Sequence, residues 1–150
     1  MSLFSIHCEN ARIVVKIGKV KIKFKNIFVN QLANCCNISE LDRLKKLGTK
    51  FPHPVGVVIL PKVKIGKNCT IFQNVTIGSW DGKTPVIGDN VVIYGNSIVF
   101  GDITIGNNVV IGCGSVVNKS VPDNVVVAGN PARIIKNIPI HEENKVLTDV

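Results

Sequence analysis

The sequence predicts a parallel β-helix, because an aliphatic residue returns every six positions along the middle of the chain. The main series contains one ten-residue step and consists of Ile59, Ile65, Ile71, Ile77, Ile87, Ile93, Val99, Ile105, Ile111 and Val117. A second inward series, two positions earlier, consists of Val57, Val63, Cys69, Val75, Val91, Ser97, Ile103, Val109 and Ser115. A helical period of 3.6 would scatter both series around a cylinder, whereas a period of six keeps each in register.

Glycine often follows the aliphatic position, as at Gly66, Gly78, Gly88, Gly106 and Gly112. We expect corners of the coil at these glycines, where the chain turns sharply or takes a positive φ. Composition agrees, since 45% hydrophobic but only 5% aromatic residues suit an interior of thin aliphatic layers. A length of 150 residues is typical of one hydrophobic core.

The segments around the repeats carry weaker patterns. Residues 13–24 alternate apolar and basic side chains, which predicts a β-hairpin whose lysines either protect a sheet edge or contact anionic lipid. Residues 30–50 form an irregular first coil or a helix, with a helical pattern over 40–47 between an N-cap at Ser39 and Gly48. Residues 125–127 predict a last strand, and residues 132–150 a tail with some helical tendency. The expected divisions are therefore 1–50, a β-helix domain over 51–136, and a tail over 137–150.

Net charge and cysteine content limit the functions that the protein can have. Eighteen Lys and Arg against ten Asp and Glu give +8, which indicates an anionic partner: nucleic acid, an acidic membrane surface or a phosphate-rich cofactor. The five cysteines lack zinc-ligand spacing, so we expect reduced thiols in a cytoplasmic protein and no metal site. No run approaches the ~18 apolar residues that a transmembrane helix needs, and no signal peptide is evident.

His53 is the first candidate catalytic residue. Counting back six from Ile59 would point this histidine into the core as a buried neutral side chain. The flanking Pro52 and Pro54 remove two backbone donors and so argue against a regular ladder at this point. A histidine at the mouth of the coil stack, with a reference pKa of ~6.5, is suited to proton transfer.

Four blocks in order resemble the hexapeptide-repeat acyltransferases of left-handed β-helix fold, over residues 53–136. The blocks are Pro52–Ile59, Gln73–Gly78, Ile111–Val117 with Val121-Pro122, and Gly129–Arg133. Within that family the match looks closest to serine O-acetyltransferases and to acetyltransferases of capsule and surface-polysaccharide clusters. The hexapeptide alone would indicate only the fold, whereas the histidine block and the Gly129–Arg133 block point to acyl transfer.

The resemblance implies that acetyl-CoA lies in a groove between neighbouring subunits of a homotrimer, with His53 as general base. A backbone N–H at a corner such as Gly78 would stabilise the charge on the thioester oxygen. The positions that match the cofactor site are Gly78, Ser79, Gly95, Asn96, Gly112 and Cys113, with Lys119, Arg133 and Lys136 for the nucleotide phosphates. This reading implies neither a metal nor a nucleic-acid partner.

Two departures from the family pattern bear on the site. Asn37 stands where the serine enzymes carry an acid that orients the catalytic histidine, so Asn37 would orient His53 instead, or Glu40 or Asp42 would substitute. The second histidine block of the serine enzymes is absent from the ten-residue step, Ser79–Val86, which argues for another acceptor.

The same step carries the candidate substrate-binding residues Trp80 and Asp81. An exposed tryptophan there could stack on a sugar or an adenine, or pack against a neighbouring subunit. The expected function is therefore acetyl transfer to a sugar hydroxyl of a surface polysaccharide, capsule or O-antigen, at the inner face of the membrane. The alternatives are serine O-acetylation in cysteine biosynthesis and a non-catalytic trimeric scaffold.

Overall fold

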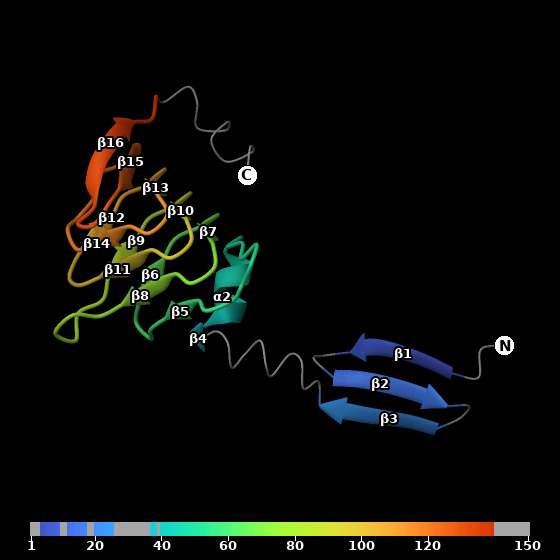
Figure 1. Cartoon of the computed structure of the whole chain (residues 1–150). Coiled ribbons are helices and arrows are strands. Elements are labelled where there is room, and N and C mark those ends of the chain that lie inside the picture. Colours follow the sequence, from blue (N-terminus) through green and yellow to red (C-terminus); the bar gives the residue numbers. More distant parts are fainter. Residues whose placement is uncertain (1–3, 10–11, 18–19, 26–36, 39, 140–150) are drawn as a thin grey trace. The chain divides into compact units, whose positions relative to one another are not determined.

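The computed structural model describes residues 4–9, 12–17, 20–25, 37–38 and 40–139 (Figure 1). The chain forms two compact units, Met1–Cys35 and Cys36–Val150. No helix in the described ranges is long and apolar enough to cross a membrane. The candidate functional residues all belong to the second unit.

The first unit is a three-stranded antiparallel sheet in the order β1-β2-β3. Its strands are β1 (Phe4–Glu9), β2 (Arg12–Ile17) and β3 (Val20–Lys25). The pairing of β2 with β3, in which Ile13 lies opposite Phe24, confirms the hairpin predicted over residues 13–24. Strand β1 was not predicted, although its sequence, FSIHCE, alternates in the same way. Contact of this hairpin with anionic lipid stays a prediction, because the side chains of these strands lie outside what is described.

The second unit is a parallel β-helix whose coils build three sheets (Figure 1). Sheet I contains β4 (Asn37–Ile38), β5 (Val58–Ile59), β8 (Thr76–Gly78), β11 (Ile98–Phe100) and β14 (Val116–Val117). Sheet II contains β6 (Lys64–Ile65), β9 (Val86–Ile87) and β12 (Thr104–Ile105). Sheet III contains β7 (Thr70–Ile71), β10 (Val92–Ile93), β13 (Val110–Ile111), β15 (Val125–Ala128) and β16 (Arg133–Asn137). The predicted β-helix of hexapeptide repeats is therefore confirmed.

Both inward series predicted from the sequence form the core. In the main series the most exposed member, Ile65, shows only 4% of its surface, and the second series does not exceed 8%. Burying each Val or Ile is worth roughly 1.5 to 3 kcal/mol, so the ladders supply most of the stabilising burial. The two buried serines, Ser97 and Ser115, both donate to the carbonyl oxygen of Gly112, which compensates for their desolvation.

Four of the five glycines that follow ladder residues, Gly66, Gly88, Gly106 and Gly112, are needed for close packing rather than for a positive φ. A Cβ on Gly88 would lie 2.8 Å from the carbonyl oxygen of Gly106, and one on Gly66 would lie 2.6 Å from that of Gly88. Neither glycine has a positive φ; two residues later, Asn68 (φ 54°) and Asn90 (φ 57°) take that conformation. The glycines lie at corners as predicted, but of the two alternatives, a sharp turn or a positive φ, the positive φ falls on asparagine instead.

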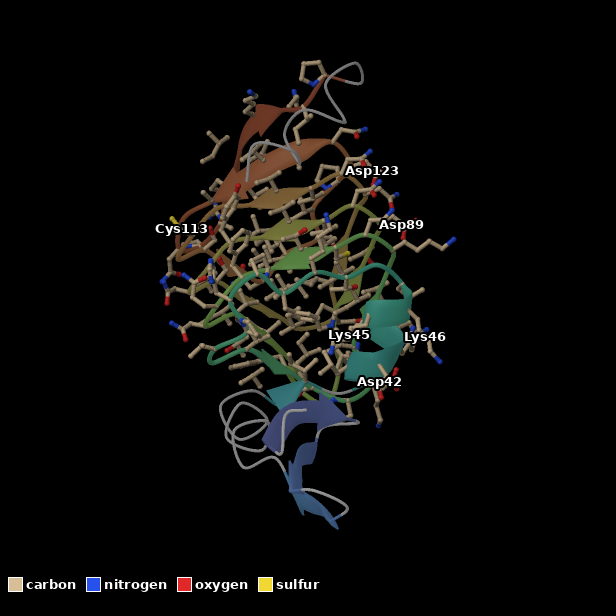
Figure 2. All side chains as sticks on the ribbon, turned by 90° about the vertical axis from the view of Figure 1, so that its right-hand side faces the viewer. Asp42, Lys45, Lys46, Asp89, Cys113 and Asp123 are labelled. Carbon is tan, nitrogen blue, oxygen red and sulfur yellow. The ribbon has the colours of Figure 1, made fainter. Side chains whose placement is uncertain are left out.

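The turns between sheets II and III make a regular corner, here called the asparagine corner: residues 66–69, 88–91, 106–109 and 122–125. Its asparagine side chains are linked coil to coil, from Asn68 to Asn90 at 3.4 Å, on to Asn108 at 3.0 Å and on to Asn124 at 2.9 Å. Carboxylates complete it, since Asp89 accepts from the Lys67 backbone N–H and Asp123 from that of Asn107, both at 2.7 Å. Figure 2 labels Asp89 and Asp123 on this edge of the coil stack.

The predicted helix over 40–47 is confirmed as α2 (Leu41–Lys46), which buries Leu44 against the first coils. Its N-cap is Glu40 in the left-handed region, without a side-chain cap, rather than Ser39 as predicted. Gly48 follows the helix with a φ of 82° and donates its N–H to Lys45, as expected for a helix end.

The last described residues are strands. Strand β15 confirms the strand predicted at 125–127. Strand β16 pairs antiparallel with β15, and Arg133 lies opposite Ala128. The helical tendency predicted for the tail was therefore wrong over 133–137, because the exposed edge of β15 offers backbone hydrogen bonds to the returning chain. The rest of the predicted tail, 140–150, lies outside the described residues.

Candidate functional site

Two corners flank sheet I and hold the candidate residues. The histidine corner, between sheets III and I, consists of the stacked turns 53–56, 73–74, 95–96 and 113–114. The hairpin corner, between sheets I and II, consists of 60–63, 78–86, 100–103 and 118–120. Backbone bonds join successive turns of the histidine corner, as from Asn96 to Gln73 and from Gly114 to Gly95. The level of each candidate residue along the stack is therefore set by the coil to which it belongs.

His53 is exposed at the lowest described turn of the histidine corner and does not point into the core. The backbone N–H of Val55 donates to the carbonyl oxygen of His53 at 2.8 Å, which closes a tight turn around Pro54. Its ring lies 6.5 Å from that of Phe72 in the next coil. The reading of His53 as a buried core histidine is therefore excluded, and the imidazole is open to a substrate.

The residues considered as partners of His53 are placed as follows. Asn37 lies in β4 opposite Val58, at the edge of sheet I beside the histidine corner, and its side chain is outside what is described. Glu40 is engaged with Arg43 at 2.7 Å. Asp42 is exposed on α2, as Figure 2 shows. Within the described side chains, none is hydrogen-bonded to the His53 imidazole.

Small residues line the histidine corner above His53. Gly95 and Asn96 occupy its third turn, and Cys113 follows Gly112 at the fourth. Cys113 is exposed at this edge, as labelled in Figure 2. A Cβ on Gly114, which has a φ of 67°, would meet nothing within 4 Å. The corner is therefore open beside Gly114 at its fourth turn, whereas Gly95 at the third turn is buried against Gln73.

Sequence reasoning missed three side chains near this corner. Phe72 and Tyr94 stack with centroids 5.0 Å apart and an interplanar angle of 15°, which extends an aromatic column upward from His53. Both directly follow a ladder residue, where other coils have glycine, and that difference could have revealed them. Gln73 belongs to the Gln73–Gly78 block, and no role was predicted for it. Its Oε1 is buried without a hydrogen-bond partner in the described structure, which leaves a polar group unsatisfied there.

The ten-residue step forms a tight hairpin rather than an open loop. Trp80 and Lys83 exchange backbone hydrogen bonds of 3.0 Å in both directions around Asp81 (φ 52°) and Gly82 (φ 75°). Positive φ at both central residues defines a type I′ turn, the usual connection of a twisted β-hairpin. Gly78 is still paired with Phe100 in the β8–β11 ladder, so Ser79 is the first residue beyond the ladder.

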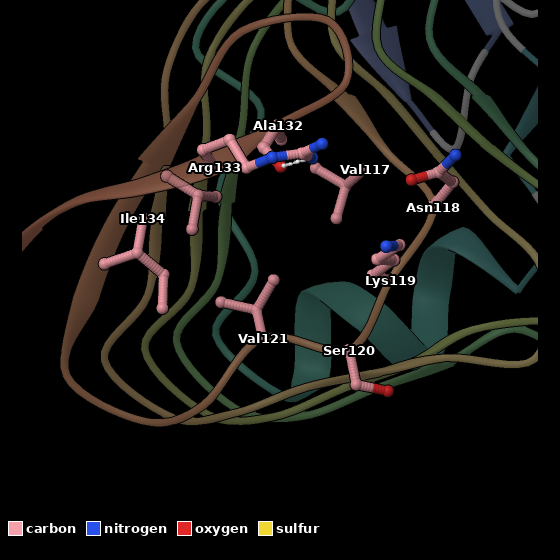
Figure 3. A pocket seen from close by; sticks show the side chains of 9 residues that line it. Val117, Asn118, Lys119, Ser120, Val121, Ala132, Arg133 and Ile134 are labelled. Carbon is pink, nitrogen blue, oxygen red and sulfur yellow. Dashed lines mark hydrogen bonds between the residues drawn. The ribbon is translucent and has the colours of Figure 1, made fainter.

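Two of the three candidate phosphate-binding cations share a cavity. Lys119 and Arg133 both line a cavity of about 370 Å³ at the C-terminal end of the coil stack, together with Val117, Asn118 and Ala132 (Figure 3). Arg133 donates to the carbonyl oxygen of Ala132 at 2.9 Å, the bond drawn in Figure 3. Lys136 is exposed on β16 opposite Val126 and does not line this cavity.

The candidate cofactor residues therefore divide into two groups on opposite sides of sheet I. Gly95, Asn96 and Cys113 belong to the histidine corner, and Gly112 directly precedes its fourth turn, whereas Gly78, Ser79 and Lys119 belong to the hairpin corner. No group of three or more metal-ligating side chains gathers within the described residues.

Comparisons with known proteins find relatives that share the repeat region. The family described as bacterial transferase hexapeptide (six repeats) matches residues 84–119. This part of the chain is therefore similar to the hexapeptide-repeat transferases. A serine acetyltransferase of Bacillus pumilus is 37% identical over 130 residues, and one of Staphylococcus epidermidis is 41% identical over 114 residues. These matches cover 83% and 72% of this chain but only 60% and 54% of the relatives, so the chain spans little more than half their length.

Solved structures show the same similarity. The serine acetyltransferase of Brucella abortus has a TM-score of 0.58 and 38% identity over 61% of this chain and 38% of its own. The enzyme of Neisseria gonorrhoeae has a TM-score of 0.61 and 33% identity, over 66% and 40%. A serine acetyltransferase in complex with CoA has a TM-score of 0.55 and 32% identity, over 67% and 39%.

These names correct the expected acceptor. The expectation of a sugar hydroxyl in a surface polysaccharide was wrong, because the relatives and structural neighbours are serine acetyltransferases. The missing histidine block had argued against serine, but the absence of one substrate-binding side chain does not identify another substrate.

Proposed function

We propose that this chain is an acetyl-CoA-dependent O-acetyltransferase whose acceptor is serine. The observation that carries the proposal is the exposed imidazole of His53 at the entrance of a β-helix related to serine acetyltransferases. The exposed ring supports proton transfer, and the small residues above it support an extended donor lying along the corner.

In the proposed reaction His53 takes the proton of the serine hydroxyl as its oxygen attacks the thioester carbon. An alcohol is a poor nucleophile near neutral pH, and a positioned base typically contributes 10²- to 10⁴-fold. The tetrahedral intermediate collapses to the O-acetyl ester, and the imidazolium returns the proton to the departing CoA thiolate. A backbone N–H at the Gly78–Ser79 step is the proposed donor to the oxyanion.

Two residues would support this chemistry. Asn37, at the edge of sheet I, would orient the imidazole by accepting a hydrogen bond, but it would not stabilise an imidazolium as a carboxylate does. Asp81 at the exposed tip of the hairpin offers a carboxylate to the serine ammonium group.

The proposed donor site requires a second copy of the chain. The candidate residues lie on both sides of sheet I, so a donor lying along one corner of a chain leaves the group at the other corner without a contact. Closed cyclic symmetry would bring the histidine corner of one copy beside the hairpin corner of the next. A homotrimer is the proposed assembly, with Lys119 and Arg133 near the nucleotide phosphates and Lys136 as a weaker candidate.

Steady-state assays of the purified full chain with acetyl-CoA and L-serine test this proposal, following free thiol and O-acetylserine. We expect the His53→Ala variant to lose about 10²- to 10⁴-fold in kcat while it still binds CoA. Lys46→Ala, an exposed change on α2, is the matched control and should keep wild-type kcat. CoA binding without His53-dependent turnover would instead indicate a non-catalytic scaffold.

A further inference from the structure

The Trp80 hairpin is bonded to the coils on either side. Besides the two backbone bonds of its turn, Lys83 forms an ion pair with Asp102 at 2.6 Å, one coil above. The Thr84 hydroxyl donates to the carbonyl oxygen of Lys62, one coil below, at 3.2 Å. Anchors above and below fix the backbone that carries Trp80, so its ring is presented from a defined place.

Trp80 is a large apolar side chain with most of its surface exposed to water, which is unfavourable. It shows 68% of its surface, more than any other large apolar side chain in the described residues. One side of it meets Phe100, with ring centroids 5.7 Å apart and a tilt of 50°. A cavity of about 450 Å³ opens beside the pair and is completed by Gly101, Asp102, Ile103 and Asn118. This volume lies within the usual range for small-molecule sites.

The lining of this cavity selects a planar, uncharged group. Its one carboxylate, Asp102, is already paired with Lys83, so the cavity has no free charge to recognise a zwitterion such as serine. Two aromatic rings offer stacking surfaces, and the amide of Asn118 can donate and accept at once. That is the pattern with which an asparagine side chain recognises the edge of adenine.

The neighbouring cavity fits the rest of a nucleotide. Asn118 lines both cavities, and in the second one Lys119 and Arg133 supply positive charge. A purine ring in the aromatic cavity would therefore have its phosphates beside two cations. In the proposed trimer this cavity faces the histidine corner of the neighbouring copy, and Trp80, Phe100 and Asn118 lie one, two and three coils above the level of its His53. With a strand spacing of about 4.8 Å, an extended arm could connect the purine with the thioester.

We propose that the cavity beside Trp80 and Phe100 binds the adenine ring of the acetyl donor. Trp80 is then a donor-binding residue rather than an acceptor-binding one. The proposal rests on the proposed use of acetyl-CoA. It adds that a large part of donor affinity comes from the hairpin.

Because Trp80 is the only tryptophan, its fluorescence reports on this cavity directly. The full-length protein is titrated with CoA, with adenosine 3′,5′-bisphosphate and with 4′-phosphopantetheine, which lacks the purine. We expect CoA and the bisphosphate to change the Trp80 emission with saturation, and 4′-phosphopantetheine to leave it unchanged. An equal response to 4′-phosphopantetheine, or no response to CoA that calorimetry shows to be bound, would overturn the proposal.

Kinetics supply the second readout. In Trp80→Ala, KM for acetyl-CoA should rise about tenfold, while KM for S-acetyl-4′-phosphopantetheine and for serine stays within about twofold. Trp80→Phe should restore most of the loss. Ile135→Ala removes a side chain of similar exposure, 65%, on β16 and should match the wild type with both donors.

The remaining outcomes separate the two proposals. Turnover with both donors, with KM raised equally for both in Trp80→Ala, would overturn the purine site and leave the transferase proposal standing. Absence of turnover, together with saturable quenching of Trp80 by CoA and the bisphosphate, would overturn the transferase proposal and leave the purine site standing. Dissociation of Trp80→Ala to smaller species in size-exclusion chromatography with light scattering would show that the ring packs against a second copy, and would also overturn the purine site.

Discussion

The asparagine corner and the histidine corner occupy equivalent turns of the same repeat, yet they are built differently. In the asparagine corner the positive-φ position is asparagine in four successive coils, and the amides link all four. In the histidine corner only Asn74 and Asn96 are linked, at 3.1 Å, and the next coil has Gly114 with open space beside it. The first corner is closed by its own side chains, whereas the second leaves room for a ligand.

The largest effect on stability is expected from filling the closed corner. Gly88→Ala would place a Cβ 2.8 Å from the Gly106 carbonyl oxygen and 2.7 Å from Asn107 Oδ1. Backbone of the next coil cannot move away without disturbing the ladder, so we expect a loss of up to about 3 kcal/mol in the free energy of unfolding. Urea unfolding measures this. A wild-type midpoint would show that the two coils can separate at no cost.

A pH dependence is expected from Cys69, which lies in the asparagine corner. Burial raises the pKa of the Cys69 thiol to about 11 from an ordinary value of 9.0. The neutral thiol is thus favoured by folding, and its contribution is fully present below pH 9 and is lost as the pH rises through about 11. The loss is about 2 to 3 kcal/mol.

Unfolding free energies of the wild type and of Cys69→Ala, measured from pH 8 to above 11, test this effect. Lysine titration is common to both proteins, so the difference between their slopes isolates the thiol. Parallel slopes across that range would contradict the prediction.

A smaller effect is expected from breaking the amide ladder at its middle. Asn90→Ala removes the bonds to Asn68 and Asn108 and puts alanine at a φ of 57°, for a combined cost of about 1 to 2 kcal/mol. Asn90→Gly keeps the conformation and removes only the side chain, so it should cost less. Thermal unfolding of the two variants separates strain from hydrogen bonding, and an equal loss in both would show that strain contributes nothing.

The smallest effect on stability is expected at Gly78, beside the proposed donor site. A Cβ there would meet only Thr76 Cγ2 at 3.9 Å and Leu60 Cδ1 at 4.0 Å, which is ordinary contact. Gly78→Ala should therefore change the free energy of unfolding by less than about 0.5 kcal/mol. If the Gly78–Ser79 step contacts the donor, KM for acetyl-CoA rises while stability holds. Destabilisation like that of Gly88→Ala would show that the hairpin corner is packed as closely as the asparagine corner.

The core could be read from the sequence because every member of both inward series repeats the same local environment. A period of six leaves one arrangement in which Ile59, Ile77 and Val99 all avoid water, and the structure has that arrangement. The corner glycines were located correctly, but the positive φ considered for them is not found and their close packing was not predicted. Whether a Cβ clashes with the next coil depends on residues about eighteen positions away, as with Gly88 and Gly106.

Individual residues of the candidate site could be predicted from the sequence, but their positions relative to one another could not. His53 stood out because two prolines interrupt the ladder around it, and its exposure agrees with that argument. Only the structure shows that Gly78 and Ser79 lie on the opposite side of sheet I from Gly95 and Cys113. The joint cavity of Lys119 and Arg133 likewise depends on the antiparallel return of β16.

By itself the sequence determined the β-helix and its aliphatic interior, because both follow from a repeating pattern; a buried and an exposed His53 both stayed open until the structure showed the exposed one. Tertiary structure alone decided which corner is closed by amides, which stays open, and how the hairpin places Trp80 beside Phe100. These features arise from contacts between residues one or more coils apart, where the spacing of the coils and the direction of each side chain set the outcome.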